Sequence, residues 1–103
     1  MVARGEVWWY EHQDHKRRPH VILSRPEAVA ILPRLVSAPA TRRARGIPSE
    51  VPLDRDDGMP EECVVSLDNI EVIDKSLLVE RICSLSDAKM EAICSAMRFV
   101  VDC

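Results

Sequence analysis

The stretch that decides the fold is Arg17-Arg18-Pro19-His20-Val21-Ile22-Leu23-Ser24, together with a second stretch, Ser37-Ala38-Pro39-Ala40-Thr41-Arg42-Arg43. Each joins a short apolar segment to arginines, which precede the segment in the first stretch and follow it in the second. A proline marks the junction in both. Because a strand fixes its backbone, side chains at its ends are held in place and still meet solvent. We therefore expect these two strand ends to converge on a site that handles an anion.

The length and composition bound the class of protein. A chain of 103 residues is one domain, 1–103, near the lower limit for an adequate core, and a second copy would add buried surface. Its 47% hydrophobic and 30% charged residues are ordinary for a globular chain. No stretch approaches the roughly 20 apolar residues of a membrane span, and no apolar signal segment opens the chain. The sequence thus predicts a cytoplasmic protein without a membrane partner.

Charge is distributed unevenly along the chain. From residue 16 to residue 45 there are eight Lys or Arg against one acid, Glu27, a net charge of +7, whereas the remainder carries −10. The overall value of −3 hides this contrast. A basic patch of this kind is typical of proteins that bind a phosphate backbone, although arginines scattered over a solvated surface would give the same composition.

Hydrophobic patterning predicts a mainly β fold. Strands are expected at residues 6–10, 20–24, 34–38, 49–53, 63–67, 69–73 and 77–83. A short inserted helix should begin after a capping box formed by Ser24 and Glu27. A C-terminal helix should follow the N-cap Ser86, with an apolar stripe at Met90, Ile93, Cys94, Met97 and Val101. Short, closely spaced strands of this kind favour a small antiparallel barrel or a strongly curled sheet.

The cysteines and histidines show no metal-ligand spacing. None of Cys63, Cys83, Cys94 and Cys103 forms a C-x-x-C pair, and two of the three histidines lie in one loop. We therefore expect no metal site and no cofactor. Free thiols in a reducing compartment are the favoured interpretation, with disulfides as the alternative.

The residues suited to chemistry are arginines, one threonine and a histidine-bearing loop. With three glycines in the chain and no G-x-S-x-G sequence, phosphate-binding loops and hydrolase elbows are excluded. Arginine donates two parallel hydrogen bonds to a phosphate and stays charged. Arg and hydroxyl donors would stabilise the charge that forms when a 2′-OH attacks its own phosphodiester. His12 or His15 could move the protons, or could simply be solvated.

Five segments, in order, carry a resemblance to a known family. They are Arg4-Gly5-Glu6-Val7-Trp8, Arg18-Pro19-His20-Val21-Ile22-Leu23-Ser24, Pro39-Ala40-Thr41, Ser49-Glu50-Val51-Pro52-Leu53, and Gly58 with Cys63-Val64-Val65-Ser66-Leu67-Asp68-Asn69-Ile70. Over nearly its full length the chain resembles the MazF/PemK-type toxins, the endoribonuclease half of a bacterial toxin–antitoxin pair.

The resemblance implies a fold, a reaction and partners. It implies an SH3-like antiparallel barrel with a C-terminal helix, a homodimer, and a small cognate antitoxin with an acidic or extended C-terminal segment. The implied reaction is metal-independent cleavage of single-stranded RNA, mRNA above all, giving a 2′,3′-cyclic phosphate and a 5′-OH. By motif position Arg18 is the catalytic arginine and Thr41 the catalytic threonine. The remaining basic residues expected to guide RNA are Lys16, Arg17, Arg42, Arg43 and Arg45.

The first loop departs from the family pattern. The family carries a glutamate several residues before the arginine, in a longer loop, and no residue here matches it by position. Glu11, His12 and His15 are therefore open hypotheses for proton transfer. Two other functions remain: a gyrase poison of the CcdB type on the same fold, and a non-catalytic RNA-binding barrel. The first depends on a C-terminal aromatic peptide, which Phe99-Val100-Val101-Asp102-Cys103 does not resemble.

Overall fold

Seven strands and two helices make up most of the computed structural model, which describes residues 1–101. In chain order the elements are β1 (Glu6–Glu11), β2 (Arg17–Ile22), α1 (Pro26–Ile31), β3 (Arg34–Thr41), β4 (Glu50–Leu53), β5 (Cys63–Ser66), β6 (Glu71–Asp74), β7 (Leu78–Ser84) and α2 (Asp87–Val100). Three short 3₁₀ turns lie between them: η1 (Arg55–Asp57), η2 (Leu67–Asn69) and η3 (Lys75–Leu77). The predicted mainly β fold with an inserted helix and a C-terminal helix is confirmed.

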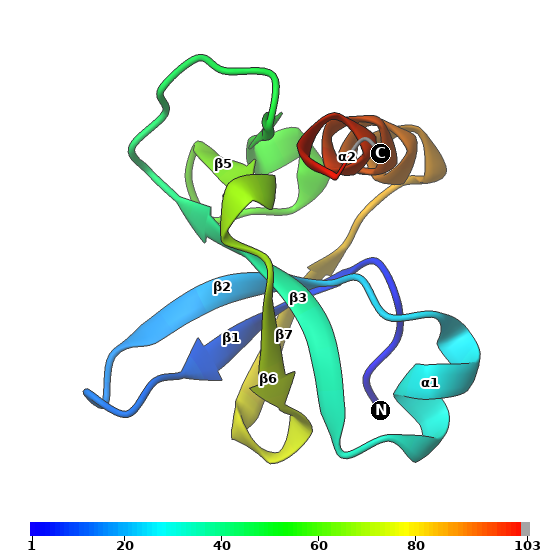
Figure 1. Ribbon diagram of the computed structural model, residues 1–103. Helices are drawn as coiled ribbons and strands as arrows, with labels where there is room; N and C mark the ends of the chain where they lie inside the picture. The colour runs from blue at the N-terminus through cyan, green and yellow to red at the C-terminus, as the bar shows by residue number, and fades with distance from the viewer. Residues whose placement is uncertain (102–103) are drawn as a thin grey trace.

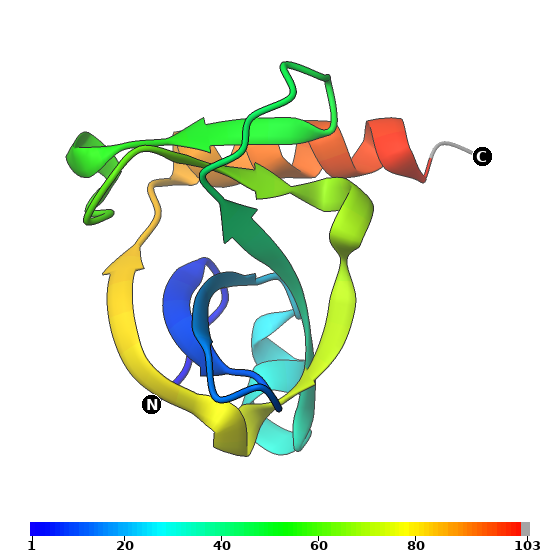
Figure 2. The same ribbon diagram turned by 90° about the vertical axis from the view of Figure 1, so that its left-hand side faces the viewer.

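The strands form one antiparallel sheet that curls like a barrel. Its order is β4-β5-β3-β2-β1-β7, and β6 also pairs with β3. Strand β3 therefore pairs with three others, while β4 and β7 stand at the two ends of the order. Figures 1 and 2 show the strands curling around the interior, with α2 across one end and α1 beside the N-terminus. Pro52 lies in β4, at the sheet edge, where its missing N–H donor is tolerated.

Two apolar clusters fill the interior. The larger packs α2 against the sheet through Val7, Val21, Val65, Leu67 and Ile93, each fully buried. The smaller lies under α1 and is formed by Ile22, Val29, Leu35 and Ile73. Within residues 1–101, no helix is both long enough and apolar enough to cross a membrane.

The helix α2 confirms its predicted cap and most of its stripe. The Ser86 hydroxyl accepts a hydrogen bond from the Lys89 backbone N–H at 3.1 Å, so the predicted N-cap is formed. Met90 and Met97 pack against the larger cluster beside Ile93. Val101, expected in the same stripe, is 58% exposed because it follows the last helical residue.

The two strands that carry the arginines are longer than predicted. Strand β2 begins at Arg17 and continues through Pro19, and β3 continues to Thr41. Proline is tolerated there because the β2–β3 pairing starts only at His20, so the Pro19 nitrogen has no donor role toward β3. Arg18 and Thr41 thus belong to strands, which hold their backbones more firmly than loops would.

The predicted capping box before α1 is wrong. The N-cap is Arg25, which makes no side-chain cap hydrogen bond. The Ser24 hydroxyl instead accepts a hydrogen bond from the Val36 backbone N–H at 2.8 Å. Ser24 therefore satisfies a strand donor of β3, a long-range role that a local four-residue pattern does not reveal.

Candidate active site

The β2–β3 register brings the two basic strand ends together. His20 lies opposite Pro39, Val21 opposite Ala38 and Ile22 opposite Ser37. Continuing this antiparallel register by two residues puts Arg18 across from Thr41. Both side chains line one cleft of about 490 Å³. The expected convergence of the two strand ends is therefore present in the fold.

The cleft combines basic walls with apolar surface. Its lining residues are Trp9, Lys16, Arg17, Arg18, Pro19, Ala40, Thr41, Arg42, Met59, Pro60, Glu61 and Cys63. Four of these are basic and only Glu61 is acidic. Cationic donors suit phosphates, and an aromatic face such as that of Trp9 suits a stacked base. The cleft thus has the chemistry of a site for single-stranded nucleic acid.

Arg18 is exposed in the cleft and is oriented by an acid from the preceding loop. Its Nη2 lies 3.3 Å from Asp14 Oδ2. Asp14 also accepts a hydrogen bond from the Lys16 backbone N–H at 2.9 Å. That backbone donor, and then Arg18, hold the pKa of Asp14 below its usual value, so it remains a carboxylate. A phosphate entering the cleft would compete with Asp14 for the guanidinium.

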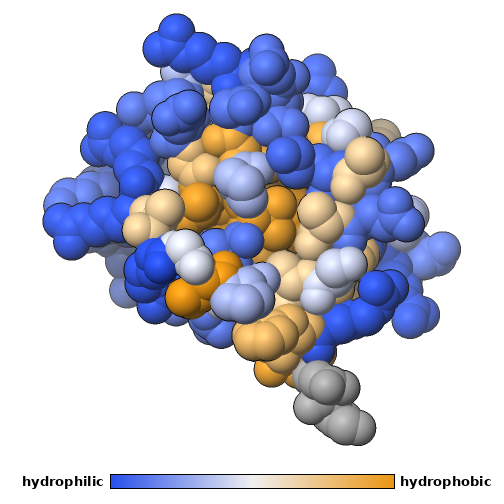
Figure 3. Space-filling view, turned by 90° about the horizontal axis from the view of Figure 1, so that it is seen from above, coloured by the Kyte–Doolittle hydropathy of each residue, from blue (hydrophilic) through white to orange (hydrophobic). Residues whose placement is uncertain are grey.

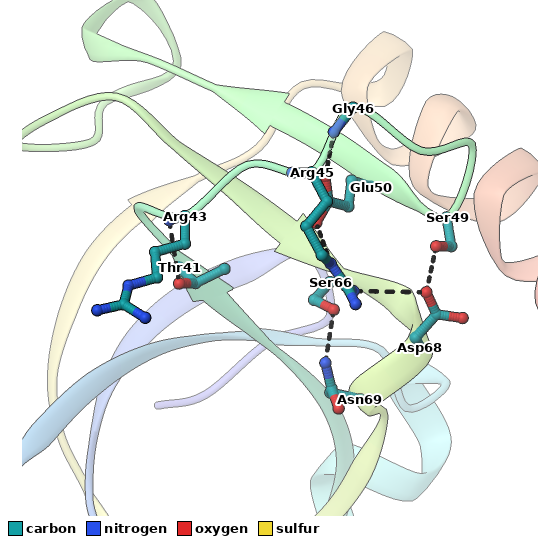
Figure 4. Close-up of polar contacts among 9 residues, drawn as sticks. All are labelled: Thr41, Arg43, Arg45, Gly46, Ser49, Glu50, Ser66, Asp68 and Asn69. Atoms are coloured by element: carbon teal, nitrogen blue, oxygen red, sulfur yellow. Dashed lines mark hydrogen bonds and ion pairs between the residues drawn. The ribbon is translucent and has the colours of Figure 1, made fainter.

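Thr41 ends β3 with its hydroxyl hydrogen free to donate. The Thr41 Oγ1 accepts a hydrogen bond from the Arg43 backbone N–H at 3.3 Å (Figure 4). A hydroxyl that accepts in this way still has one O–H donor. The turn after β3 therefore positions the Thr41 oxygen and leaves its proton for a ligand.

The loop after Thr41 is anchored by Glu50 and Asp68 (Figure 4). Glu50 accepts hydrogen bonds from the backbone N–H groups of Arg45 at 2.7 Å and Gly46 at 3.1 Å. These donors, that of Arg45 above all, lower the pKa of Glu50. The Arg45 guanidinium lies 3.2 Å from Glu50 and 3.7 Å from Asp68. Among the predicted RNA-guiding residues, Arg45 and Arg43 thus follow the cleft on this loop, while Lys16, Arg17 and Arg42 line it.

The three residues expected to transfer protons lie apart from the cleft lining. Glu11 ends β1, with its carboxylate 3.9 Å from Arg17 Nε. His12 borders a second hollow of about 400 Å³. His15 is exposed at the tip of the loop, with a φ of 64°. The structure therefore does not bring Glu11, His12 or His15 against Arg18 and Thr41, and their role in proton transfer stays a prediction.

Two chemically important residues escaped the sequence reasoning. Glu61 reaches the cleft from the segment after η1, and its carboxylate lies 3.5 Å from Arg42 Nη1. His20 is fully buried in β2, and its Nδ1 lies 2.9 Å from the Ser37 hydroxyl. Burial, and then electrostatic interaction with His12 and Arg18, lower the pKa of His20 from 6.5 to about 4. For His20, its position inside an apolar run was the one sequence signal of a buried polar group. No sequence signal pointed to Glu61.

The cysteines that the structure describes form no disulfide bond, and the reduced state stays a prediction. Cys63, Cys83 and Cys94 are free, and Cys103 lies outside the described residues. Burial, helped by nearby Cys83 and acidic groups, raises the pKa of Cys63 to about 11. Although Cys63 lines the cleft, its thiol stays protonated at neutral pH and is a poor nucleophile.

Comparison with known proteins assigns the family. Residues 3–101 match the family model of the PemK-like, MazF-like toxins of type II toxin–antitoxin systems. The chain belongs to that family, which confirms the resemblance drawn from its motifs.

Individual relatives cover nearly the whole chain. The protein is 45% identical to the probable endoribonuclease MazF5 of Mycobacterium tuberculosis, over 100% of this chain and 95% of the relative. The solved structure of M. tuberculosis toxin MazF-mt6 is 30% identical, with a TM-score of 0.86, over 94% of this chain and 96% of that one. A mycobacterial endoribonuclease in complex with its cognate antitoxin shares the fold at 24% identity, with a TM-score of 0.89 over 99% and 96% of the two chains.

The buried His20 predicts acid-sensitive stability. In metal-free buffer the unfolded chain should protonate this histidine near pH 6.5, whereas the folded chain resists until about pH 4. The neutral His20 side chain therefore contributes its full stabilisation above pH 6.5. As the pH falls from 6.5 to 4, the unfolding free energy should decrease by up to about 3 kcal/mol. Urea unfolding across this range should show the loss in the wild type and a flatter profile in His20→Asn. His15→Ala should behave as wild type; equal slopes in the wild type and His20→Asn would contradict the assignment.

Proposed function

We propose that the protein is the toxin of a type II toxin–antitoxin pair and acts as a metal-independent endoribonuclease on single-stranded mRNA. The observation that carries the proposal is the basic cleft in which Arg18 and Thr41 lie at adjoining strand ends. Membership of the MazF-like family supports it, as does the relative named as a probable endoribonuclease at 45% identity. Cleavage would occur at a short sequence in the cytoplasm, where mRNA is found.

The proposed reaction is attack by a 2′-OH on the adjacent phosphorus. The 2′-oxygen forms a new P–O bond as the bond to the 5′-oxygen breaks, which leaves a 2′,3′-cyclic phosphate and a 5′-OH. Negative charge builds on the non-bridging oxygens during this exchange. The Arg18 guanidinium and the Thr41 O–H would donate hydrogen bonds to that charge, which lowers the barrier without a metal.

The reaction also needs a base to take the 2′-OH proton and an acid to protonate the leaving oxygen. Glu61 is the acidic side chain that lines the cleft, so we favour it for proton transfer. The earlier candidates, Glu11, His12 and His15, would need the loop between β1 and β2 to move toward the cleft.

The remaining basic residues would hold the RNA backbone on either side of the cleaved bond. Lys16 and Arg17 line the cleft from the β2 side, and Arg42 from the β3 side. Arg43 and Arg45 would extend this path along the loop that follows. Trp9 would stack against a base, a contact that tolerates any sequence.

The same cleft would bind the antitoxin. A small antitoxin with an acidic or extended C-terminal segment would be attracted by the basic residues and would exclude RNA by competition. In the related mycobacterial structure the endoribonuclease is in complex with its cognate antitoxin. An antitoxin that occupies the RNA site would inhibit cleavage without a conformational change in the toxin.

A homodimer would cover the apolar surface left on one subunit. The large apolar side chains exposed in the structure are Met1, Ile31, Leu32, Val36, Val72, Val79, Phe99 and Val101. Figure 3 shows apolar residues gathered on the face that includes α2, ringed by hydrophilic ones. A patch of this kind is typical of an interaction surface, and a small domain benefits from covering it.

The first test is cleavage of a long unstructured RNA in the presence of EDTA. The wild type should cut at defined sites, and Arg18→Ala and Thr41→Ala should each lower the rate by about 10²–10³-fold. Arg55→Ala is the matched control, since this exposed arginine lies in η1 and should leave the rate unchanged. RNA that stays intact at high wild-type concentration would refute the ribonuclease and leave the non-catalytic RNA-binding barrel or the gyrase poison.

A second test is the salt dependence of RNA binding, measured with the Thr41→Ala protein to prevent cleavage. Affinity should fall steeply with salt because the basic side chains displace condensed counterions. Adding Arg42→Ala should reduce the slope of log K against log salt by about 0.7, the value for one phosphate contact on a single strand. Arg55→Ala should not change the slope. Affinity that is independent of salt would rule out the basic cleft as the RNA site.

Sedimentation velocity tests the proposed dimer. Tag-free protein at micromolar concentration should sediment as two chains, because burying the apolar face is favourable in water. A species of 11.7 kDa at that concentration would contradict the dimer.

A further inference from the structure

A cluster of three donor side chains lies beside the second hollow, apart from the cleft lining. His12, His20 and Glu71 each offer one ligand-type atom, and these three atoms all lie within 4.8 Å of one another. They come from the loop after β1, from β2 and from β6. Because residues 12, 20 and 71 follow no spacing motif, the sequence predicted no metal site.

Two of the three distances inside the cluster are close to those between neighbouring ligands of a tetrahedral metal site. His12 Nε2 lies 3.3 Å from His20 Nε2, and Glu71 Oε1 lies 3.6 Å from the same nitrogen. Zinc bonds of about 2.0–2.1 Å to nitrogen and oxygen set neighbouring ligands about 3.3 Å apart. Both pairs that include His20 are therefore close to this spacing. The ligand atoms of His12 and Glu71, which lie within 4.8 Å of each other, would have to approach each other to coordinate one ion.

The buried histidine is already held in the orientation that a ligand requires. The hydroxyl of Ser37, itself fully buried, lies 2.9 Å from His20 Nδ1. If Nδ1–H donates to this hydroxyl, the lone pair of Nε2 faces His12 and Glu71. A hydrogen bond on the second imidazole nitrogen is the usual support of a metal-bound histidine.

The strand pairing and the loop place the other two ligands. Glu71 lies opposite Ser37 in the β3–β6 register, so the carboxylate comes from the strand next to the supporting hydroxyl. The His12 backbone N–H donates to the Lys16 carbonyl at 2.9 Å, and its own carbonyl accepts from the His15 N–H at 2.9 Å. The Tyr10 ring packs against both imidazoles, with centroids 4.8 and 4.9 Å away.

We propose that His12, His20 and Glu71 form a binding site for a divalent transition-metal ion, zinc foremost. Two imidazoles and one carboxylate are a donor set that zinc uses in sites with an open fourth position. His12, Glu71 and Asp14 also line the hollow of about 400 Å³, which gives water or another ligand access to that position.

A bound ion would tie the β1–β2 loop to β6. The same loop carries Asp14, whose carboxylate orients Arg18 at 3.3 Å. The ion would thus steady the loop beside the cleft without entering the cleft. This site is independent of the proposed ribonuclease chemistry, which needs no metal, so each proposal can fail without the other.

The test is zinc titration of tag-free, chelator-treated protein by calorimetry, with thermal unfolding measured alongside. The wild type should bind one equivalent of Zn²⁺, and its Tm should rise because the ion binds the folded chain more tightly than the unfolded chain. His12→Ala, in a half-buried loop position, should weaken binding by more than about 100-fold, beyond the loss typical of a supporting residue. Glu71→Gln, on an exposed strand position, should also weaken it.

The control variant is His15→Ala, which removes an exposed histidine of the same loop and should bind as wild type. Co²⁺ as a probe should give the visible bands of a tetrahedral nitrogen and oxygen site, without charge transfer from thiolate. Absence of Zn²⁺ binding, equal binding by His12→Ala and the wild type, or a thiolate spectrum from the cysteines would each overturn the proposal.

Discussion

The antiparallel register between β2 and β3 is the constraint on which the site depends. Val21 and Ala38 face each other in this ladder and are both fully buried. Val21 packs into the larger apolar cluster and Ile22 into the smaller one, so a slip of one residue would turn each side chain toward the wrong cluster, and the packing on both faces enforces the register. Because the pairing is fixed there, Arg18 and Thr41 are carried to the same end of the sheet. Packing deep in the molecule thus sets the position of two exposed polar groups.

The arginines around the cleft are held by acids that a phosphate can replace. Asp14 pairs with Arg18 at 3.3 Å and Glu61 with Arg42 at 3.5 Å, and all four side chains are well exposed. Exposed ion pairs contribute only about 0–1 kcal/mol, so exchanging a carboxylate for a phosphate costs little. Arg45 differs, because it meets both Glu50 and Asp68 and so fastens the loop after Thr41. The arginines of this basic stretch therefore differ in role: Arg18 and Arg42 are available to bind a phosphate, whereas Arg45 stabilises the loop after Thr41.

Local signals predicted those features that local physics determines. The β-rich run at residues 6–10 and the Ser86 cap both follow from patterns a few residues long. The convergence of Arg18 and Thr41 was also predictable, because it follows from two strand ends. The continuation of β2 through Pro19 and the hydrogen bond accepted by Ser24 were not predicted, because both depend on which strand packs beside the segment in the folded sheet. Glu61 and the His12–His20–Glu71 cluster join distant residues through the curl of the sheet, which no spacing in one sequence records.

The most direct measurement of the central claim is a double-mutant cycle on RNA cleavage with Arg18→Ala, Thr41→Ala and the double variant. If both donors act on one phosphate, the double variant should lose clearly less than the product of the two single losses. The pair Arg18→Ala and Arg55→Ala serves as the reference for independent sites. The rate loss of its double variant should equal the product of the two single rate losses. If the rate loss of the double variant Arg18→Ala/Thr41→Ala equalled the product of the two single losses, the two side chains would act separately. That result would contradict a shared site at the β2–β3 strand ends.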